Sequence, residues 1–176
     1  ADMLHPQLPE FEGICPVVVP VGIDQDPHLR IARDMARRAK SYKFDPLCST
    51  YNILIPGLKG EKMSSSDPAS YVALTDTPSQ VKNKINKYAF SGGKDTLEEH
   101  RKHGGNPDID ISFQYLKMFF EPSDEKLSKI EQDYRSGKLL SGELKKILIE
   151  KINTFLETHQ KKKKKAKSQI SKYLDN

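Results

Sequence analysis

One short segment, residues 62–66, contains the residue types that bind a polyphosphate. It has the sequence Lys-Met-Ser-Ser-Ser and lies within residues 57–68, which also contain two glycines, an aspartate and a proline. Backbone N–H groups in such a loop can point toward an anion, the lysine adds a positive charge, and the hydroxyl groups add hydrogen-bond donors. The alternative is a polar surface turn, because clusters of glycine, serine, aspartate and proline are also common in loops.

A second group of polar residues follows the apolar run at residues 16–20, which is typical of a buried strand in a parallel sheet. Ligands of open α/β sheets bind beyond the carboxyl ends of the strands. Gly22 would let a ligand approach the backbone, Asp24 could bind both hydroxyls of a ribose, and Gln25 offers a donor and an acceptor. The alternative for Asp24 is to cap the next helix, and for Asp26 we favour that capping role.

The elements around these residues indicate an α/β domain with parallel strands over residues 1–76. A strand at residues 16–20 is followed by a helix that we expect to begin with Asp26 as its N-cap and Pro27 at its first position. Strand, turn and helix form half of a β-α-β unit. We expect one more short strand at residues 71–74.

Residues 77–176 predict an all-helical domain, because apolar residues at helical spacing follow residues that favour helix starts. Thr77, Pro78 and Gln80 have the pattern of a capping box. The expected helix starts share a side chain that can accept an N-terminal N–H, and they are Thr77, Asp95, Asp108, Ser123 and Ser141. The last helix could extend to Leu174.

The charge of the chain is concentrated near its C-terminus. The 176 residues have a formal net charge of +5, and six lysines lie at positions 161–165 and 167. Without these lysines the acidic residues slightly outnumber the basic ones, so a uniformly basic nucleic-acid coat is excluded. No apolar stretch approaches the roughly 20 residues of a membrane span. The two cysteines have no metal-ligand spacing, and we expect reduced thiols in a cytoplasmic protein. The five histidines do not cluster, so we expect surface histidines and no metal site.

Three segments in order resemble one family. Residues 62–66 resemble the KMSKS signature of class I aminoacyl-tRNA synthetases. Residues 21–28, Val-Gly-Ile-Asp-Gln-Asp-Pro-His, resemble the G-x-D-Q segment of the tyrosine and tryptophan enzymes, and residues 88–101 resemble the tryptophan branch. The chain is thus similar to the C-terminal half of the tryptophan enzymes of eukaryotic and archaeal type. This resemblance implies the C-terminal part of a Rossmann-like nucleotide-binding domain, followed by a helical anticodon-binding domain.

The resemblance also implies a reaction and its participants. Tryptophan is activated with ATP and Mg2+ to tryptophanyl-adenylate and is then transferred to tRNA(Trp). Gly22 and Asp24 would contact the ATP ribose, and Gln25 would bind the polar head group of tryptophan. The residues that would contact ATP or stabilise the leaving pyrophosphate are Lys62, Met63, Ser64, Ser65 and Ser66. Ser65 stands where KMSKS has its second lysine, so Lys62 would provide more of the catalytic charge.

Other expectations concern the helical part and the partners. Lys161, Lys162 and Lys163 could contact tRNA phosphates, and the alternative is a solvated helix end. Four aromatic residues are expected in the core rather than as base-stacking platforms: Phe113, Tyr115, Phe119 and Phe120. The chain has no H-x-G-H-type element, so we expect an N-terminal half of the same enzyme as a partner, and the family forms homodimers. The alternatives are a tyrosine enzyme, or a tRNA-binding fragment without catalysis.

Overall fold

The computed structural model describes residues 2–172, with the side chain of residue 172 excepted. The chain divides into two compact units, Ala1–Ile55 and Pro56–Asn176. This division lies upstream of the boundary that we expected at residue 76. The reason is that Leu58 is fully buried in the same core as the helices that follow it, so residues 56–76 pack with the helical unit.

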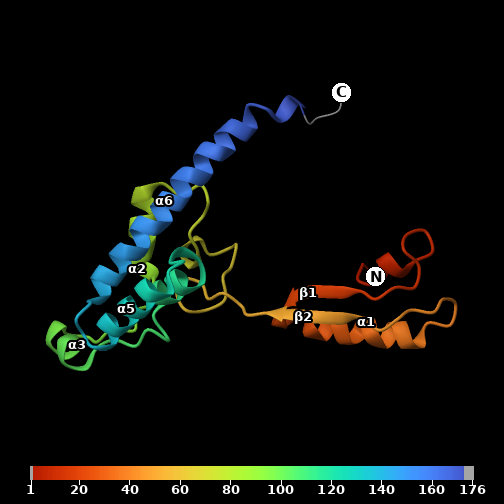
Figure 1. The fold of residues 1–176 in the computed structure, drawn as a ribbon, viewed down its shortest axis with the longest axis horizontal. Coiled ribbons are helices and arrows are strands. Elements are labelled where there is room, and N and C mark those ends of the chain that lie inside the picture. The colour runs from red at the N-terminus through yellow and green to blue at the C-terminus, as the bar shows by residue number, and fades with distance from the viewer. Residues whose placement is uncertain (1, 173–176) are drawn as a thin grey trace. The chain divides into compact units, whose positions relative to one another are not determined.

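The first unit contains two parallel strands joined by a helix (Figure 1). Strand β1, Val18–Gly22, pairs with β2, Cys48–Asn52, in a register that places Val18 beside Cys48 and Gly22 beside Asn52. Short 3-10 turns span His5–Gln7 and Ile23–Gln25. The β1 prediction is confirmed with bounds two residues further along the chain than expected, and β2 was not expected.

Helix α1, Asp26–Arg38, buries one face against this unit's core. We expected Asp26 to be the N-cap, but it is the first helical residue, and Gln25 occupies the cap position without a side-chain bond. The buried apolar residues of this core are Leu4, Leu29, Ala32, Ala36 and Leu47.

The second unit is helical (Figure 1). Its helices are α2, Pro78–Tyr88; α3, Leu97–His103; α4, Ile111–Tyr115; α5, Asp124–Arg135; and α6, Ser141–Lys167. A π-helical turn, Leu116–Phe120, follows α4, and 3-10 turns span Pro68–Ser70 and Ile170–Lys172. The expected strand at residues 71–74 is wrong, because the Asp76 carboxylate accepts a bond from the Ala73 N–H at 2.8 Å and holds a turn there.

Two helix starts agree with the sequence. The capping box of α2 is confirmed, since Gln80 N–H donates to Thr77 Oγ1 at 3.3 Å and Thr77 N–H donates to Gln80 Oε1 at 2.8 Å. Ser123 caps α5 by accepting from the Lys126 N–H. Helix α3 begins one residue later than expected, with Thr96 rather than Asp95 as its cap.

Two further helix starts and one helix end differ from the sequence predictions. Asp110 rather than Asp108 caps α4, because its Oδ1 accepts from the N–H groups of Ser112 and Phe113. Ser141 is the first residue of α6 and not its cap. Helix α6 ends at Lys167, and Leu174, which we expected to end it, lies outside the described residues.

A buried cluster of hydrogen-bonded polar residues links α3, α4 and α5 within the second unit. The phenol of Tyr134 donates to Asp110 Oδ2 at 2.8 Å, and the Gly92 N–H donates to the same oxygen at 2.8 Å. The His100 ring lies 5.3 Å from the Tyr134 ring, and its Nε2 is 2.9 Å from the Leu139 carbonyl oxygen. The expectation of surface histidines is therefore wrong for His100. Its ring is buried because both ring nitrogens have hydrogen-bond partners, the Lys94 N–H and the Leu139 carbonyl.

Candidate functional site: the exposed loop and the end of strand β1

The base of the loop at residues 56–70 is fixed on the core of the second unit. The Gly57 N–H donates to the Glu61 carbonyl at 2.6 Å, and Pro56 pairs with Lys62 in an isolated antiparallel bridge. Gly60 has a φ of +86°, which favours glycine at this turn. The fully buried Leu58 accepts a backbone bond from the Phe90 N–H at 2.8 Å. The base is thus held by both hydrogen bonds and apolar packing.

The signature segment Lys62–Ser66 leaves this base and is exposed along its whole length. Ser64 Oγ lies 2.8 Å from Ser66 Oγ, and the Asp67 N–H donates to the Ser64 carbonyl at 3.1 Å. The segment therefore presents one lysine and neighbouring hydroxyls to solvent on a turn that backbone bonds hold in shape. Such a set of donors and charge suits a polyphosphate ligand.

An ion pair joins the two sides of the signature segment. Lys59 Nζ lies 2.6 Å from Asp67 Oδ2, and Lys59 also lies 5.9 Å from the centre of the Tyr88 ring. The hydrogen bond from Lys59 lowers the pKa of the Asp67 carboxyl, and the same bond raises the pKa of Lys59. Asp67 also accepts from the Ala69 N–H and so begins the turn Pro68–Ser70.

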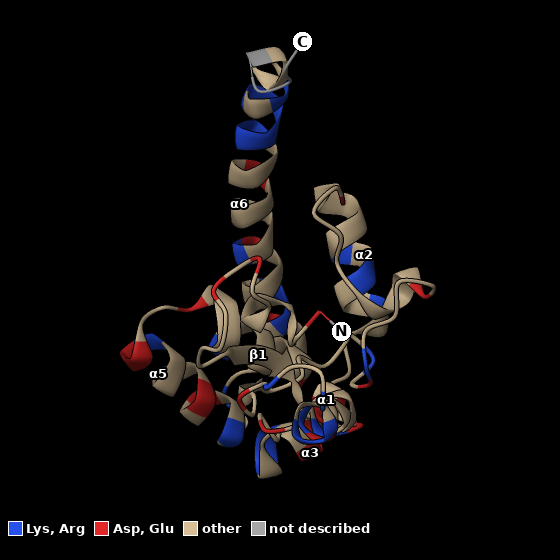
Figure 2. Ribbon diagram, turned by 90° about the vertical axis from the view of Figure 1, so that its right-hand side faces the viewer, with Lys and Arg blue, Asp and Glu red and all other residues tan. Residues whose placement is uncertain are grey.

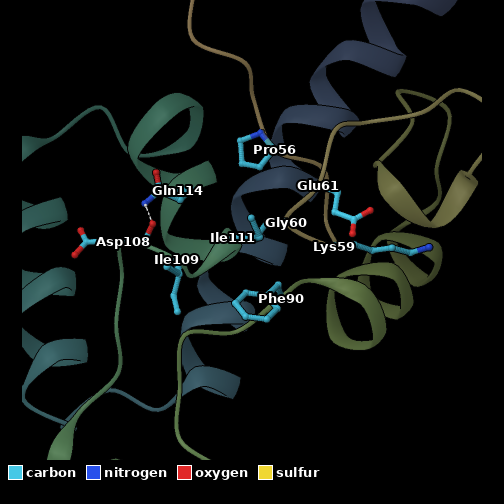
Figure 3. A pocket seen from close by; sticks show the side chains of 9 residues that line it. All are labelled: Pro56, Lys59, Gly60, Glu61, Phe90, Asp108, Ile109, Ile111 and Gln114. Atoms are coloured by element: carbon cyan, nitrogen blue, oxygen red, sulfur yellow. Dashed lines mark hydrogen bonds between the residues drawn. The ribbon is translucent and has the colours of Figure 1, made fainter.

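A cavity of about 460 Å³ lies beside the loop base within the second unit (Figure 3). Phe90 and Ile109 are each about half exposed, and the Gln114 amide donates to the Asp108 carbonyl at 3.2 Å. The residues that line the cavity are Pro56, Lys59, Gly60, Glu61, Phe90, Asp108, Ile109, Ile111 and Gln114. None of the predicted site residues lines it, and the sequence contains no motif that would have indicated it.

The second group of predicted residues lies at the carboxyl end of β1, as expected, in the first unit. Gln25 Nε2 donates to Asp24 Oδ2 at 3.2 Å. A Cβ added at Gly22 would lie 2.7 Å from Asp24 Oδ1, so the Asp24 side chain would have to move from this position to accommodate it. The carboxylate of Asp24 and the amide of Gln25 thus form one polar group beyond the strand.

Asp26 has a structural role in the first unit. It accepts hydrogen bonds from the Tyr51 phenol and from Arg30 Nε, the latter at 2.6 Å. Both hydrogen bonds lower the pKa of the Asp26 carboxyl, and the bond from Tyr51 has the larger effect. Asp26 therefore joins α1 to β2, which is a structural role but not the capping role that we favoured for it.

The predicted lysines lie on the last turns of α6, where basic residues follow one another (Figure 2). Lys161, Lys162 and Lys163 are exposed, and Lys161 Nζ lies 2.6 Å from Glu157 Oε1. Consecutive positions on a helix point in different directions, so the cationic side chains surround the helix axis.

The predicted aromatic core is confirmed in part. Phe113 and Tyr115 are buried, and Phe120 is partly buried against the core. Phe119 is 54% exposed, so the core prediction is wrong for it. The chain leaves α4 through a π-helical turn, which changes the direction of successive side chains from that of a continuous α-helix.

Within residues 2–172, no helix combines the length and the apolar character that crossing a membrane requires.

Comparisons with known proteins agree on one family. Residues 2–157 match the family model of class I tRNA synthetases (W and Y). The chain is 56% identical to the tryptophan–tRNA ligase of Sulfurisphaera tokodaii over 154 residues. The matched region covers 88% of this chain and 40% of the relative. The chain is also 50% identical over 157 residues to the human cytoplasmic tryptophan–tRNA ligase, and this match covers 88% of this chain and 32% of the relative. The chain thus spans less than half the length of these relatives.

Solved structures give the same result. The crystal structure of tryptophanyl-tRNA synthetase from Aeropyrum pernix superposes with a TM-score of 0.87 at 44% identity, over 99% of this chain and 47% of that chain. The tyrosyl-tRNA synthetase from Aeropyrum pernix, at 19% identity and a TM-score of 0.62, shares the fold. The family model covers most of the chain, and the chain therefore belongs to the class I aminoacyl-tRNA synthetases of the tryptophan and tyrosine type.

Proposed function

We propose that this chain is part of a tryptophan–tRNA ligase, which activates tryptophan with ATP and transfers it to tRNA(Trp). The observation that carries the proposal is the exposed Lys62–Ser66 segment on its fixed base, in a chain that is 56% identical to a tryptophan–tRNA ligase. We propose tryptophan rather than tyrosine as the substrate because the tyrosyl-tRNA synthetase from Aeropyrum pernix is only 19% identical, whereas the tryptophanyl-tRNA synthetase from that organism is 44% identical.

In this reaction the tryptophan carboxylate attacks the α-phosphorus of ATP, the bond from that phosphorus to the bridging oxygen breaks, and pyrophosphate leaves. Negative charge builds on the leaving group, so a fixed cation and fixed donors lower the barrier. Lys62 supplies that charge, and the hydroxyls of Ser64, Ser65 and Ser66 donate to phosphate oxygens. The backbone at Met63 contacts the nucleotide near the adenine.

The polar group beyond β1 binds the other parts of the substrates. Asp24 accepts from the ribose hydroxyls, Gly22 allows the ribose to approach the backbone, and Gln25 binds the head group of tryptophan. Among the described residues no three histidine, cysteine or acidic side chains gather to hold a metal ion. Mg2+ would bind through the ATP phosphates, since Mg2+ in nucleotide sites is usually held by substrate phosphates, waters and one or two carboxylates.

The remaining parts of the chain have proposed roles in tRNA binding and assembly. Residues 1–76 belong to the catalytic nucleotide-binding domain, and residues 77–176 form the anticodon-binding domain. Lys161, Lys162 and Lys163 contact tRNA phosphates without sequence preference. The active site is completed by an N-terminal half with the H-x-G-H-type element, and the complete enzyme is a homodimer in the cytoplasm.

The test is tryptophan-dependent exchange of labelled pyrophosphate into ATP by the complete enzyme that contains this chain, with tyrosine as the control amino acid. Exchange with tryptophan alone is the expected result. Exchange with tyrosine would overturn the substrate assignment. Exchange with neither, together with salt-dependent tRNA binding, would support the tRNA-binding fragment instead.

A further inference from the structure

The buried hydroxyl of Ser70 contacts the backbone of the exposed signature segment. Ser70 is only 4% exposed, although it ends the turn Pro68–Ser70 on the loop. Its Oγ accepts from the Ser64 N–H at 3.1 Å and lies 2.7 Å from the Asp67 carbonyl oxygen and 3.1 Å from that of Ser64. A hydroxyl has one proton and two lone pairs, so Ser70 donates to one of these carbonyls while it accepts from Ser64.

The backbone of Ser70 is bound to the fixed base of the same loop. Its carbonyl accepts from the N–H of the fully buried Leu58 at 2.8 Å. A Cβ added at Gly57 would lie 2.8 Å from this carbonyl oxygen, so the close approach of the two segments requires glycine. Ser70 therefore connects the core to Ser64, through its carbonyl on one side and its hydroxyl on the other.

This connection decides which groups of Ser64 face solvent. Both backbone groups of Ser64 are directed at Ser70, while its hydroxyl lies next to that of Ser66 in the exposed part of the segment. We propose that Ser70 is a positioning residue, which orients the exposed hydroxyls and Lys62 toward the ATP phosphates without touching the nucleotide. This inference rests on the proposed function. Misplacement of catalytic groups by about 1 Å can lower a rate by roughly 10²-fold, so a positioning hydroxyl has a measurable effect.

The experiment compares three variants of the complete enzyme. Ser70→Ala removes the hydroxyl, and Ser70→Thr keeps it. Ser112→Ala is the matched control, because Ser112 in α4 is fully buried and its Oγ has no hydrogen-bond partner among the described residues. Each variant is measured for kcat and KM for ATP in tryptophan-dependent exchange. Each is also measured for the rate of tryptic cleavage after Lys62, and circular dichroism checks that it is folded.

We expect Ser70→Ala to lower kcat by about tenfold or more, with KM for ATP within about twofold of the unsubstituted enzyme. Tryptic cleavage after Lys62 should be faster by about tenfold, since the segment loses its link to the core. Ser70→Thr should keep most of the activity and of the protection. If Ser70→Ala and Ser112→Ala have the same kcat and the same rate of tryptic cleavage, the positioning role is overturned.

The two readouts also separate this inference from the proposed function. The cleavage assay requires no catalysis, so it tests the connection between Ser70 and the segment directly. If the unsubstituted enzyme exchanges pyrophosphate with neither amino acid, the proposed function fails, whatever the cleavage rates are. If exchange proceeds and Ser70→Ala changes only the cleavage rate, the proposed function stands and the catalytic positioning role is overturned.

Discussion

The ammonium of Lys59 lies 2.6 Å from the carboxylate of Asp67, and these two residues flank the signature segment Lys62–Ser66. Both side chains are partly exposed, at 44% and 39%, so the pair is solvated. Pairs of this kind contribute little to the stability of a protein. We therefore expect the Lys59–Asp67 pair to influence the shape of the loop rather than the stability of the fold.

The first prediction concerns the titration of Asp67. The hydrogen bond from Lys59 favours the ionised carboxylate, so the pKa of Asp67 lies below the ordinary value of 3.8. Because the pKa is lower in the folded state, the contribution of the pair is present above the ordinary pKa and is lost as the pH falls through the folded value. Lys59→Met should raise the pKa of Asp67 toward 3.8, measured by carbon NMR of the carboxyl group.

The control for this titration is Lys82→Met, which removes the charge of an exposed lysine on α2. It should leave the Asp67 titration unchanged. An Asp67 carboxyl that titrates identically in Lys59→Met and in the unsubstituted chain would show that the pair is not formed in solution.

A second prediction concerns the titration of two buried tyrosines, Tyr115 and Tyr134. Burial raises the pKa of Tyr115 and of Tyr134 to about 12, above the ordinary value of 10.0. The folded state therefore keeps protons that the unfolded state loses, so the free energy of unfolding falls as the pH rises above 10. Phenolate absorbance should show that Tyr115 and Tyr134 titrate near pH 12 or with unfolding.

Tyr134→Phe assigns one of these late steps. It should remove one late-titrating phenol and reduce the loss of stability above pH 10. Its cost at neutral pH is about 1–3 kcal/mol, since Asp110 and Ser141 lose a partner in the core. Titration of Tyr115 and Tyr134 near pH 10 in the folded chain would contradict the burial of these phenols.

The third prediction concerns the close backbone contacts at Gly92. A Cβ at this position would lie 1.9 Å from the Asn106 carbonyl oxygen, which is backbone and cannot rotate away. Gly92→Ala should lower the free energy of unfolding by about 2 kcal/mol or more, measured by urea denaturation.

Gly142→Ala is the matched control, because nothing lies within 4 Å of its added Cβ and the residue is in the first turn of α6. Alanine is the better helix former, so this variant should be unchanged or more stable by up to about 1 kcal/mol. Equal stabilities of the two variants would show that the contact at Gly92 is relieved by movement of residue 106.

Much of the fold could be predicted from local signals. The capping box at Thr77, the strand near residue 18 and the helices of the second unit depend on neighbours in sequence, and the structure contains them. Strand β2, Cys48–Asn52, was missed because it has mostly polar residues, and its pairing with β1 is what makes it a strand.

The parts of the site that were missed depend on contacts distant in sequence. The composition of the Lys62–Ser66 segment was enough to predict an exposed loop. The sequence alone does not distinguish Ser70 from the other serines of that loop. Its importance lies in its contacts with Leu58 and Ser64. His100 likewise could not be identified as buried, since its partner is the carbonyl of Leu139.

The fourth prediction concerns the lysines on α6. Replacing Lys161, Lys162 and Lys163 with glutamine should weaken tRNA binding and lower the slope of log K against log salt concentration by roughly 2 to 3. The control replaces three exposed lysines elsewhere, which are Lys40, Lys82 and Lys129. A slope that the α6 variant leaves unchanged would exclude these lysines as phosphate contacts.

The central claim is that Lys62 stabilises the charge that develops on the leaving pyrophosphate. The most direct test is kcat and KM for ATP in tryptophan-dependent exchange, for Lys62→Ala and for the exposed control Lys82→Ala in the complete enzyme. We predict that Lys62→Ala lowers kcat by roughly 10²-fold or more while KM for ATP changes much less, and that the control has no effect. A loss confined to ATP affinity, or a kcat equal to that of the control, would contradict the account.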